Sequence, residues 1–309
     1  MTTIYFSHQS FLEHDTGLGH PENADRLRAI ERALAANEFE RLDRRDAPRG
    51  TREQIRLIHG ERYIDYVLDA VPQEGFSYLD GDTVVSPRSG EAALHAVGAA
   101  CAAVDAVFAQ ASTNAFCAVR PPGHHAEPGA AMGFCLFNNV AIAAEYARKQ
   151  HGIERVAIVD FDVHHGNGTQ NAFQAKKYVM YASTHQFPWY PGTGKSEETG
   201  VGNIINVPLA AGSGSKEFRS AFVERILPAL NRFSPELLLI SAGFDAHRND
   251  PLANLNLVED DYAWVTSELM AVAEKHAEGR LVSVLEGGYN LGALGKSVAA
   301  HVSVLMGRG

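Results

Sequence analysis

The chain has 309 residues, with 37 acidic and 27 basic side chains, 14 histidines and three cysteines. Hydrophobic residues make up 45% and charged residues 21%, which is typical of a globular protein with one large core and excludes collagen-like, disordered and disulfide-framework classes. The net charge of −10 argues against nucleic acid as a partner, because binding to phosphates needs clustered Lys and Arg.

The predicted elements alternate between strands and helices. The first hundred residues contain a predicted strand at 3–6 and helices at 23–36, 62–70 and 90–110. Further strands are predicted at 115–119, 156–161, 178–182, 204–207, 237–241 and 281–285, and further helices at 139–149, 216–231, 259–275 and 291–305. This order predicts an α/β protein with a central parallel sheet flanked by helices. We expect a single domain over residues 1–309, with the early helices packed on the same sheet.

The sequence shows no export or membrane signal, so we expect a cytoplasmic protein with no membrane partner. The first eight residues lack the basic and apolar regions of a signal peptide. The apolar stretch at 92–111 is interrupted by polar side chains, which favours a core helix over a membrane span. Cys101, Cys117 and Cys135 form no paired motif and lie among apolar residues, as buried reduced thiols do.

Four polar loops follow predicted strands. They comprise residues 120–125, 160–169, 241–252 and 286–290. Because the carboxyl ends of parallel strands meet at one edge of a sheet, we expect side chains from these loops to converge there.

Three of these loop residues form a candidate metal site. Asp162 and His164 are two residues apart at a strand end, and Asp245 ends another strand. Carboxylate and imidazole suit Zn²⁺, and three protein ligands leave a fourth position for water or substrate. A helix cap or a hydrogen-bonded loop is the alternative for Asp162 and His164 alone. Gly166 stands where a two-metal site of the Asp-x-His-x-Asp type would have a second Asp, which favours a single ion.

The other polar groups suit proton transfer beside such an ion. His124 and His125 follow a stiff Pro-Pro-Gly segment, and one of them can take a proton from water. Asp160 can hold one imidazole cationic, while the neutral Asn167 can orient the other. The hydroxyl of Tyr289 can stabilise an oxyanion, although packing is the alternative for this side chain. The set predicts metal-assisted addition of water to an amide or ester carbonyl.

The motifs that carry these residues resemble those of the histone deacetylase superfamily, which includes acetylpolyamine amidohydrolases and acetoin-utilisation proteins. They are Gly-His-His at 123–125, Asp-Phe-Asp-Val-His-His-Gly-Asn-Gly-Thr at 160–169, Ser-Ala-Gly-Phe-Asp-Ala at 241–246 and Glu-Gly-Gly-Tyr-Asn at 286–290. Shorter matches lie at 19–22 with Arg26, at 58–63, at 133–135 and at 190–194. The matches follow the family order over nearly the whole chain.

The resemblance implies an arginase-like fold and a role for each matching residue. Asp162, His164 and Asp245 would bind one zinc ion. His125 would be the general base and acid with Asn167 behind it, and His124, paired with Asp160, would be its electrostatic partner. Tyr289 would hydrogen-bond the scissile carbonyl. The substrate tunnel would be lined by Gly133, Phe134 and Tyr190, with Leu252 at its rim, and Arg26 would line an inner channel for acetate release.

The resemblance also implies a structural potassium ion and a subfamily. The potassium site would fall on Asp160, Asp162, His164, Ser183 and Thr184, partly through main-chain oxygens, and a second site would include Phe173. Asn at 167 is typical of class II-like deacetylases. Tyr at 289 is typical of the family members that are active on acetyl-lysine. We therefore expect a zinc-dependent deacetylase acting on acylated lysine or a lysine-like amine. The alternatives are an acetylpolyamine amidohydrolase, which Leu252 disfavours, and a non-catalytic protein that binds acyl ligands.

Overall fold

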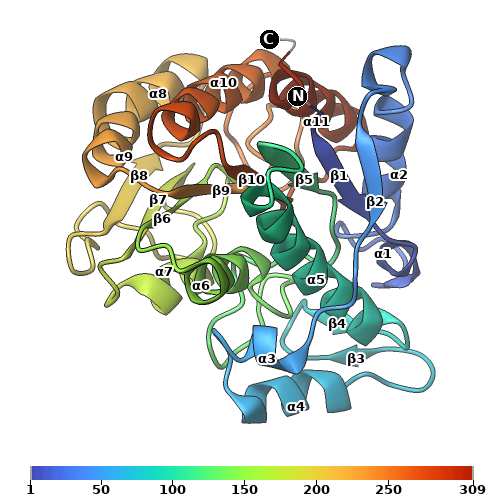
Figure 1. Cartoon of the computed structure of the whole chain (residues 1–309). Coiled ribbons are helices and arrows are strands. Elements are labelled where there is room, and N and C mark those ends of the chain that lie inside the picture. Colours follow the sequence, from blue (N-terminus) through green and yellow to red (C-terminus); the bar gives the residue numbers. More distant parts are fainter. Residues whose placement is uncertain (1, 308–309) are drawn as a thin grey trace.

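A computed structural model describes residues 2–307 and has a central sheet of eight parallel strands (Figure 1). The strands follow the order β2-β1-β5-β10-β9-β6-β7-β8 across the sheet. Their bounds are β1 Ile4–Ser7, β2 Asp43–Asp46, β5 Asn114–Cys117, β6 Val156–Asp160, β7 Val179–Gln186, β8 Ile204–Leu209, β9 Leu237–Ala242 and β10 Leu281–Leu285. The predicted α/β fold is confirmed. The ends of the predicted domain, residues 1, 308 and 309, lie outside the described residues.

Helices cover both faces of the sheet, which explains why the central strands are continuously apolar and buried (Figure 1). One face is covered by α5, Ser89–Phe108, and α6, Asn139–His151. The other face is covered by α2, Asp25–Ala33, α10, Glu259–His276, and α11, Leu291–Leu305. By length and composition α5 can cross a membrane, but 72% of its apolar stretch is buried, as expected of a core helix.

A second, smaller core lies on the outer side of α5 and α6, and it corrects one prediction. Helix α4, Glu61–Asp69, predicted at 62–70, does not pack on the sheet as expected, and neither does α3, Arg52–Ile55, a short helix that was not predicted. Their apolar residues, including Ile55 and Val67, pack instead against Leu94 of α5. Strands β3, Ser77–Tyr78, and β4, Val84–Val85, form a short hairpin beside them.

Several elements escaped the sequence analysis because their patterns are short or polar. The edge strand β2 reads Asp-Arg-Arg-Asp, and only its pairing with β1 makes it a strand. The short helices α1, Ser10–Glu13, and α7, Asn167–Phe173, were also missed. The helix predicted at 216–231 consists of α8, Ser215–Ala221, a π-helical turn at Phe222–Ile226, and α9, Leu227–Phe233.

Candidate active site

The predicted metal ligands and catalytic residues lie at or after the carboxyl ends of four neighbouring strands in the middle of the sheet. In sheet order these are β5, β10, β9 and β6. His124 and His125 follow β5, Tyr289 follows β10, and Asp245 follows β9. Asp160 ends β6, in register with Ser241 of β9. Parallel pairing therefore brings the four polar loops together, as the strand pattern led us to expect.

Asp162, His164 and Asp245 form a buried cluster whose three ligand atoms lie within 4.8 Å of one another. His164 Nδ1 is 3.1 Å from Asp162 Oδ1 and 3.2 Å from Asp245 Oδ2. The other carboxylate oxygens are held by the backbone: Val163 donates to Asp245 Oδ1 and Gly287 to Asp162 Oδ2. The three remaining atoms thus face one point, and these residues can hold a metal ion.

The surroundings of this cluster fit a cation. Asp245 Oδ2 is buried and has no hydrogen-bond partner, which is costly for a carboxylate. A side chain at position 287 would place its Cβ 2.1 Å from this oxygen, so only glycine allows the loop to enclose the cluster. Two carboxylates and an imidazole are a donor set that suits Zn²⁺.

The pKa values within the cluster also indicate that it lacks positive charge. Burial raises the pKa of Asp245 to about 7, and the charge of Asp162 adds to the rise. Burial disfavours the charged form of His164, but its hydrogen bond to Asp162 and the nearby negative charge of Asp245 raise its pKa to about 10. Protons therefore hold the cluster together when no ion is bound, and a divalent cation would displace them.

His124 pairs with a carboxylate and is cationic. Its Nδ1 lies 3.0 Å from Asp160 Oδ2, and both side chains are buried. Burial opposes the positive charge of His124, but the attraction of Asp160, Asp162 and Glu286 raises its pKa to about 10. Asp160 is held in turn by the hydroxyl of Tyr181, which donates to Oδ2 at 3.0 Å.

His125, the next residue, pairs with a neutral amide and is uncharged. Its Nδ1 donates to Asn167 Oδ1 at 2.8 Å. Burial and the neighbouring His124 lower the pKa of His125 well below its usual value. The two imidazole centroids are 4.0 Å apart, so one charged and one neutral imidazole lie in contact beside the metal cluster. The two histidines thus have unequal partners, a carboxylate for His124 and an amide for His125, which is the arrangement from which unequal roles are predicted.

Sequence analysis missed three acidic residues that support the site. Glu286 is fully buried and accepts backbone hydrogen bonds from Gly123 and His124 at 2.7 and 3.1 Å. Asp250 Oδ2 accepts from the backbone of Tyr289 at 2.7 Å, and Glu127 accepts from the Asn167 amide at 2.9 Å. The only signal in the sequence was their place within the four polar loops and the segment after His125.

Tyr289 lies against Phe134 and Arg26. The Phe134 and Tyr289 rings meet edge to face at 6.0 Å, and the Arg26 guanidinium lies 5.1 Å from the Tyr289 ring centre. Burial and the charge of Asp245 raise the pKa of Tyr289 well above its usual value, so the hydroxyl keeps its proton and can donate it in a hydrogen bond.

Two of the predicted tunnel residues, Gly133 and Tyr190, lie against His125. The Tyr190 ring meets His125 edge to face at 5.2 Å, and it lies 6.0 Å from His164. A Cβ on Gly133 would stand 2.4 Å from the His125 ring, so only glycine fits at this position. Phe134 has a φ of 68°, a strained conformation held by its hydrogen bond to Thr83. The carbonyl of Leu252 accepts from Trp189 at 2.9 Å.

Arg26 is fully buried, and its guanidinium forms hydrogen bonds within the protein. It donates to the carbonyls of Glu286 and Gly288 and to Glu22 Oε1. Glu22 also binds Arg120 through two nitrogen atoms. The predicted role of Arg26 in acetate release stays a prediction, whereas its contacts anchor the turn that carries Tyr289.

Of the residues predicted to bind potassium, Asp160, Asp162 and His164 belong to the cluster at the end of β6. Ser183 and Thr184 lie on β7, and Phe173 lies at the end of α7. Ser183 is buried and paired in register with Asp160 of β6. Its hydroxyl contacts His185 Nδ1 at 2.9 Å, and Thr184 follows it along the strand. The Phe173 carbonyl, at the end of α7, accepts from Asn203 at 2.9 Å.

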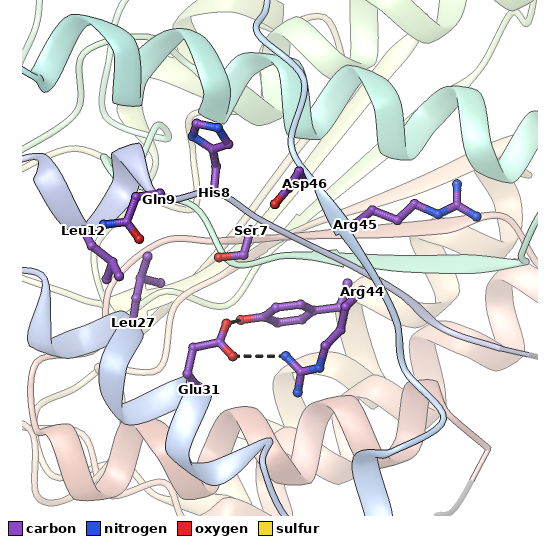
Figure 2. Close-up of a pocket in the computed structure, with 10 residues that line it drawn as sticks. Ser7, His8, Gln9, Leu12, Leu27, Glu31, Arg44, Arg45 and Asp46 are labelled. Carbon is purple, nitrogen blue, oxygen red and sulfur yellow. Dashed lines mark hydrogen bonds and ion pairs between the residues drawn. The ribbon is translucent and has the colours of Figure 1, made fainter.

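A pocket of about 420 Å³ lies between α2 and strands β1 and β2, away from these residues (Figure 2). Glu31 within it accepts from the Tyr5 hydroxyl and from Arg44. None of the predicted site residues line this pocket. The pocket is therefore separate from the candidate active site.

Comparisons with known proteins agree with the motifs. Residues 20–305 match the family model described as histone deacetylase domain. The chain is 41% identical to histone deacetylase 14, chloroplastic, of Arabidopsis thaliana, over 93% of the chain and 73% of that protein. It is 41% identical to the histone deacetylase-like amidohydrolase of Pseudomonas aeruginosa, over 88% of the chain and 73% of that protein. The crystal structure of the HDA15 HD domain superposes with a TM-score of 0.94 at 37% identity, covering 100% of this chain and 90% of that one.

Proposed function

This chain belongs to the histone deacetylase family, and on that premise we propose that it is a zinc-dependent amidohydrolase that removes acetyl, or a similar short acyl group, from lysine or a lysine-like amine. The observation that carries the proposal is the contact between one charged and one neutral imidazole beside a three-ligand metal cluster. Hydrolysis of an amide needs both states, because one group must accept a proton while positive charge stabilises the oxyanion.

Each side chain has a task in this reaction. Asp162, His164 and Asp245 would hold the zinc ion, which would supply a Lewis acid for the water and the carbonyl. His125 has its Nδ1 proton engaged by Asn167, which leaves Nε2 free to take the proton of the attacking water. The same imidazolium can then protonate the leaving amine. His124, kept cationic by Asp160, stabilises the developing negative charge.

The remaining site residues bind and orient the substrate. The Tyr289 hydroxyl donates a hydrogen bond to the carbonyl oxygen as it gains charge. Gly133, Phe134 and Tyr190 form walls suited to an aliphatic chain, with Leu252 at the rim. An acylated amine is uncharged at its end, and the apolar walls favour such a group over a free ammonium.

Potassium is a further proposed component. Asp160, which holds His124, would share the ion with Asp162, His164, Ser183 and Thr184, and Phe173 would contribute to a second site. The register of Ser183 beside Asp160 supports the first site. Titration of the zinc-loaded protein with KCl against NaCl, following turnover, tests whether potassium acts specifically.

The decisive experiment compares kcat/KM of the zinc-loaded protein for an acetyl-lysine peptide and for acetylspermidine. We expect turnover of the peptide with the larger kcat/KM. A preference for acetylspermidine would favour the polyamine alternative. Zinc and a hydroxamate inhibitor bound stoichiometrically, without turnover of any acylated amine, would refute the enzymatic proposal and leave a binding protein.

A further inference from the structure

The proposed general base, His125, depends on the side-chain amide of Asn167, whose two ends differ in hydrogen bonding. Asn167 Oδ1 can only accept a hydrogen bond, so His125 Nδ1 must carry the proton and Nε2 keeps its lone pair. If the amide were rotated by half a turn, Nδ2 would face His125 and could only donate. The imidazole would then carry its proton on Nε2 and would be unable to accept one from water.

The orientation of Asn167 is set on its other side, by acceptors around Nδ2. Glu127 Oε1 accepts at 2.9 Å, Met132 Sδ lies at 3.2 Å and the His125 carbonyl at 3.4 Å. Sulfur is a weak acceptor, and the carbonyl is at the long limit for a hydrogen bond. The carboxylate therefore contributes most, because hydrogen bonds to charged acceptors are the stronger ones.

Glu127 is itself held in place by helix α7. Asn171 Nδ2 donates to Glu127 Oε2 at 3.0 Å. Asn167 and Asn171 are four residues apart on α7 and so share one face, where they bind the two oxygens of a single carboxylate. The backbone of Glu127 is fixed separately, by a hydrogen bond from its N–H to the Ala130 carbonyl at 2.9 Å. Replacing the side chain therefore leaves the loop anchored.

We propose that Glu127 is a positioning residue for the general base, holding the Asn167 amide in the orientation that keeps His125 Nε2 free. The inference rests on the proposed function only in its kinetic consequence. The His125–Asn167–Glu127 chain places the negative charge one amide away from the imidazole. Glu127 thereby fixes the tautomer of His125 without the direct contact that Asp160 makes with His124.

Three variants test this inference. Glu127→Met keeps the size of the side chain and replaces both carboxylate oxygens by a weakly accepting sulfur. We expect kcat to fall about 10-fold with KM nearly unchanged, since the weaker acceptors still favour the native orientation. Glu127→Gln can offer an oxygen to Asn167, and we expect it to retain kcat within about three-fold. Asn171→Ala, the matched control, removes the other partner of Glu127 but keeps the hydrogen bond between Glu127 and Asn167, so its kcat should lie closer to that of the wild type than the kcat of Glu127→Met does.

The tautomer is measured directly by ¹⁵N NMR of the histidine side chains in the zinc-loaded protein, with His125 assigned by its loss in His125→Gln. We expect a protonated Nδ1 in the wild type and in Glu127→Gln, and a population protonated on Nε2 in Glu127→Met. An unchanged tautomer and kcat in Glu127→Met would overturn the inference, as would equal losses in Glu127→Gln and Glu127→Met. Absence of turnover in the wild type, with the expected tautomer shift, would refute the proposed function and support the positioning role.

Discussion

Within residues 2–307, two of the buried clusters of charged side chains balance their charge in opposite ways. In one, the single carboxylate of Glu22 binds Arg26 and Arg120, and all three side chains are fully buried. In the other, the carboxylates of Asp162 and Asp245 share one imidazole. The first cluster has enough cations within the chain, and the second lacks one.

The pKa values show the difference. Burial alone would raise the pKa of Glu22, but Arg120 and then the other cations bring it down to about 2. The pKa of Asp245 instead rises to about 7. Removing one partner from a self-sufficient cluster leaves an uncompensated buried charge and destabilises the fold, whereas a cluster that is short of positive charge is suited to bind an ion.

Asp245→Asn should give the largest effect of the predictions that test this comparison. Removing a charged ligand should lower zinc binding and reduce kcat on the order of 10³-fold. The zinc-free variant should unfold at the same or a higher urea concentration than the zinc-free wild type, because an unpartnered carboxylate has gone. Metal analysis and urea titration measure both.

A control for this variant is Asp261→Asn, which alters a buried carboxylate that already binds Arg219 and Ser215. It should keep its zinc and lose stability. Stoichiometric zinc in Asp245→Asn would contradict the assigned ligand set.

Glu22→Gln should lower stability, in contrast to Asp245→Asn. It leaves two buried guanidinium groups without a counter-charge, so the free energy of unfolding should fall by about 3–5 kcal/mol. Urea unfolding at neutral pH measures the change. A loss below about 1 kcal/mol would mean that the cluster does not stabilise the fold as its geometry indicates.

Tyr289 lies between the two clusters, and Tyr289→Phe distinguishes its role in catalysis from its role in packing. Phenylalanine keeps the ring against which Arg26 packs and removes only the hydroxyl. We expect kcat to fall about 10²-fold while the free energy of unfolding stays within about 0.5 kcal/mol of the wild type. An unchanged kcat would refute the proposed role of the hydroxyl.

The smallest predicted effect is the dependence of stability on pH in the acid range. The pKa of Glu22 is lower in the folded state, about 2 against an ordinary 4.5, so its contribution to stability is present above pH 4.5 and is lost as pH falls towards 2. The difference in unfolding free energy between the wild type and Glu22→Gln should therefore narrow in that range. A difference that stays constant down to pH 2 would contradict the assigned pKa.

The sequence predicted the centre of the molecule well because apolar strands and the polar loops after them carry strong local patterns. Asp162, His164 and Asp245 follow strands that are buried on both faces, and parallel pairing leaves their loops only one edge to share. Elements whose structure depends on a neighbour were missed. Strand β2 is highly charged and forms only by pairing with β1.

Partners of buried charged residues were equally hidden. Glu22 meets Arg120 across 98 residues, and Glu127 meets Asn167 across 40. In the sequence each acid resembles a solvated loop residue, because only the folded chain decides which donor it reaches. The roles of such residues depend on side-chain geometry, which local patterns do not encode.

The position of the site on four central strands also affects how it can be assembled. The hydrogen bond from Gly123 to Glu286 joins residues 163 apart, and that from Gly287 to Asp162 joins residues 125 apart. No short segment contains the metal cluster, so high-affinity zinc binding should arise late in folding, when these distant contacts close. Zinc affinity would then serve as a sensitive measure of native assembly in variants and in fragments rejoined after cleavage.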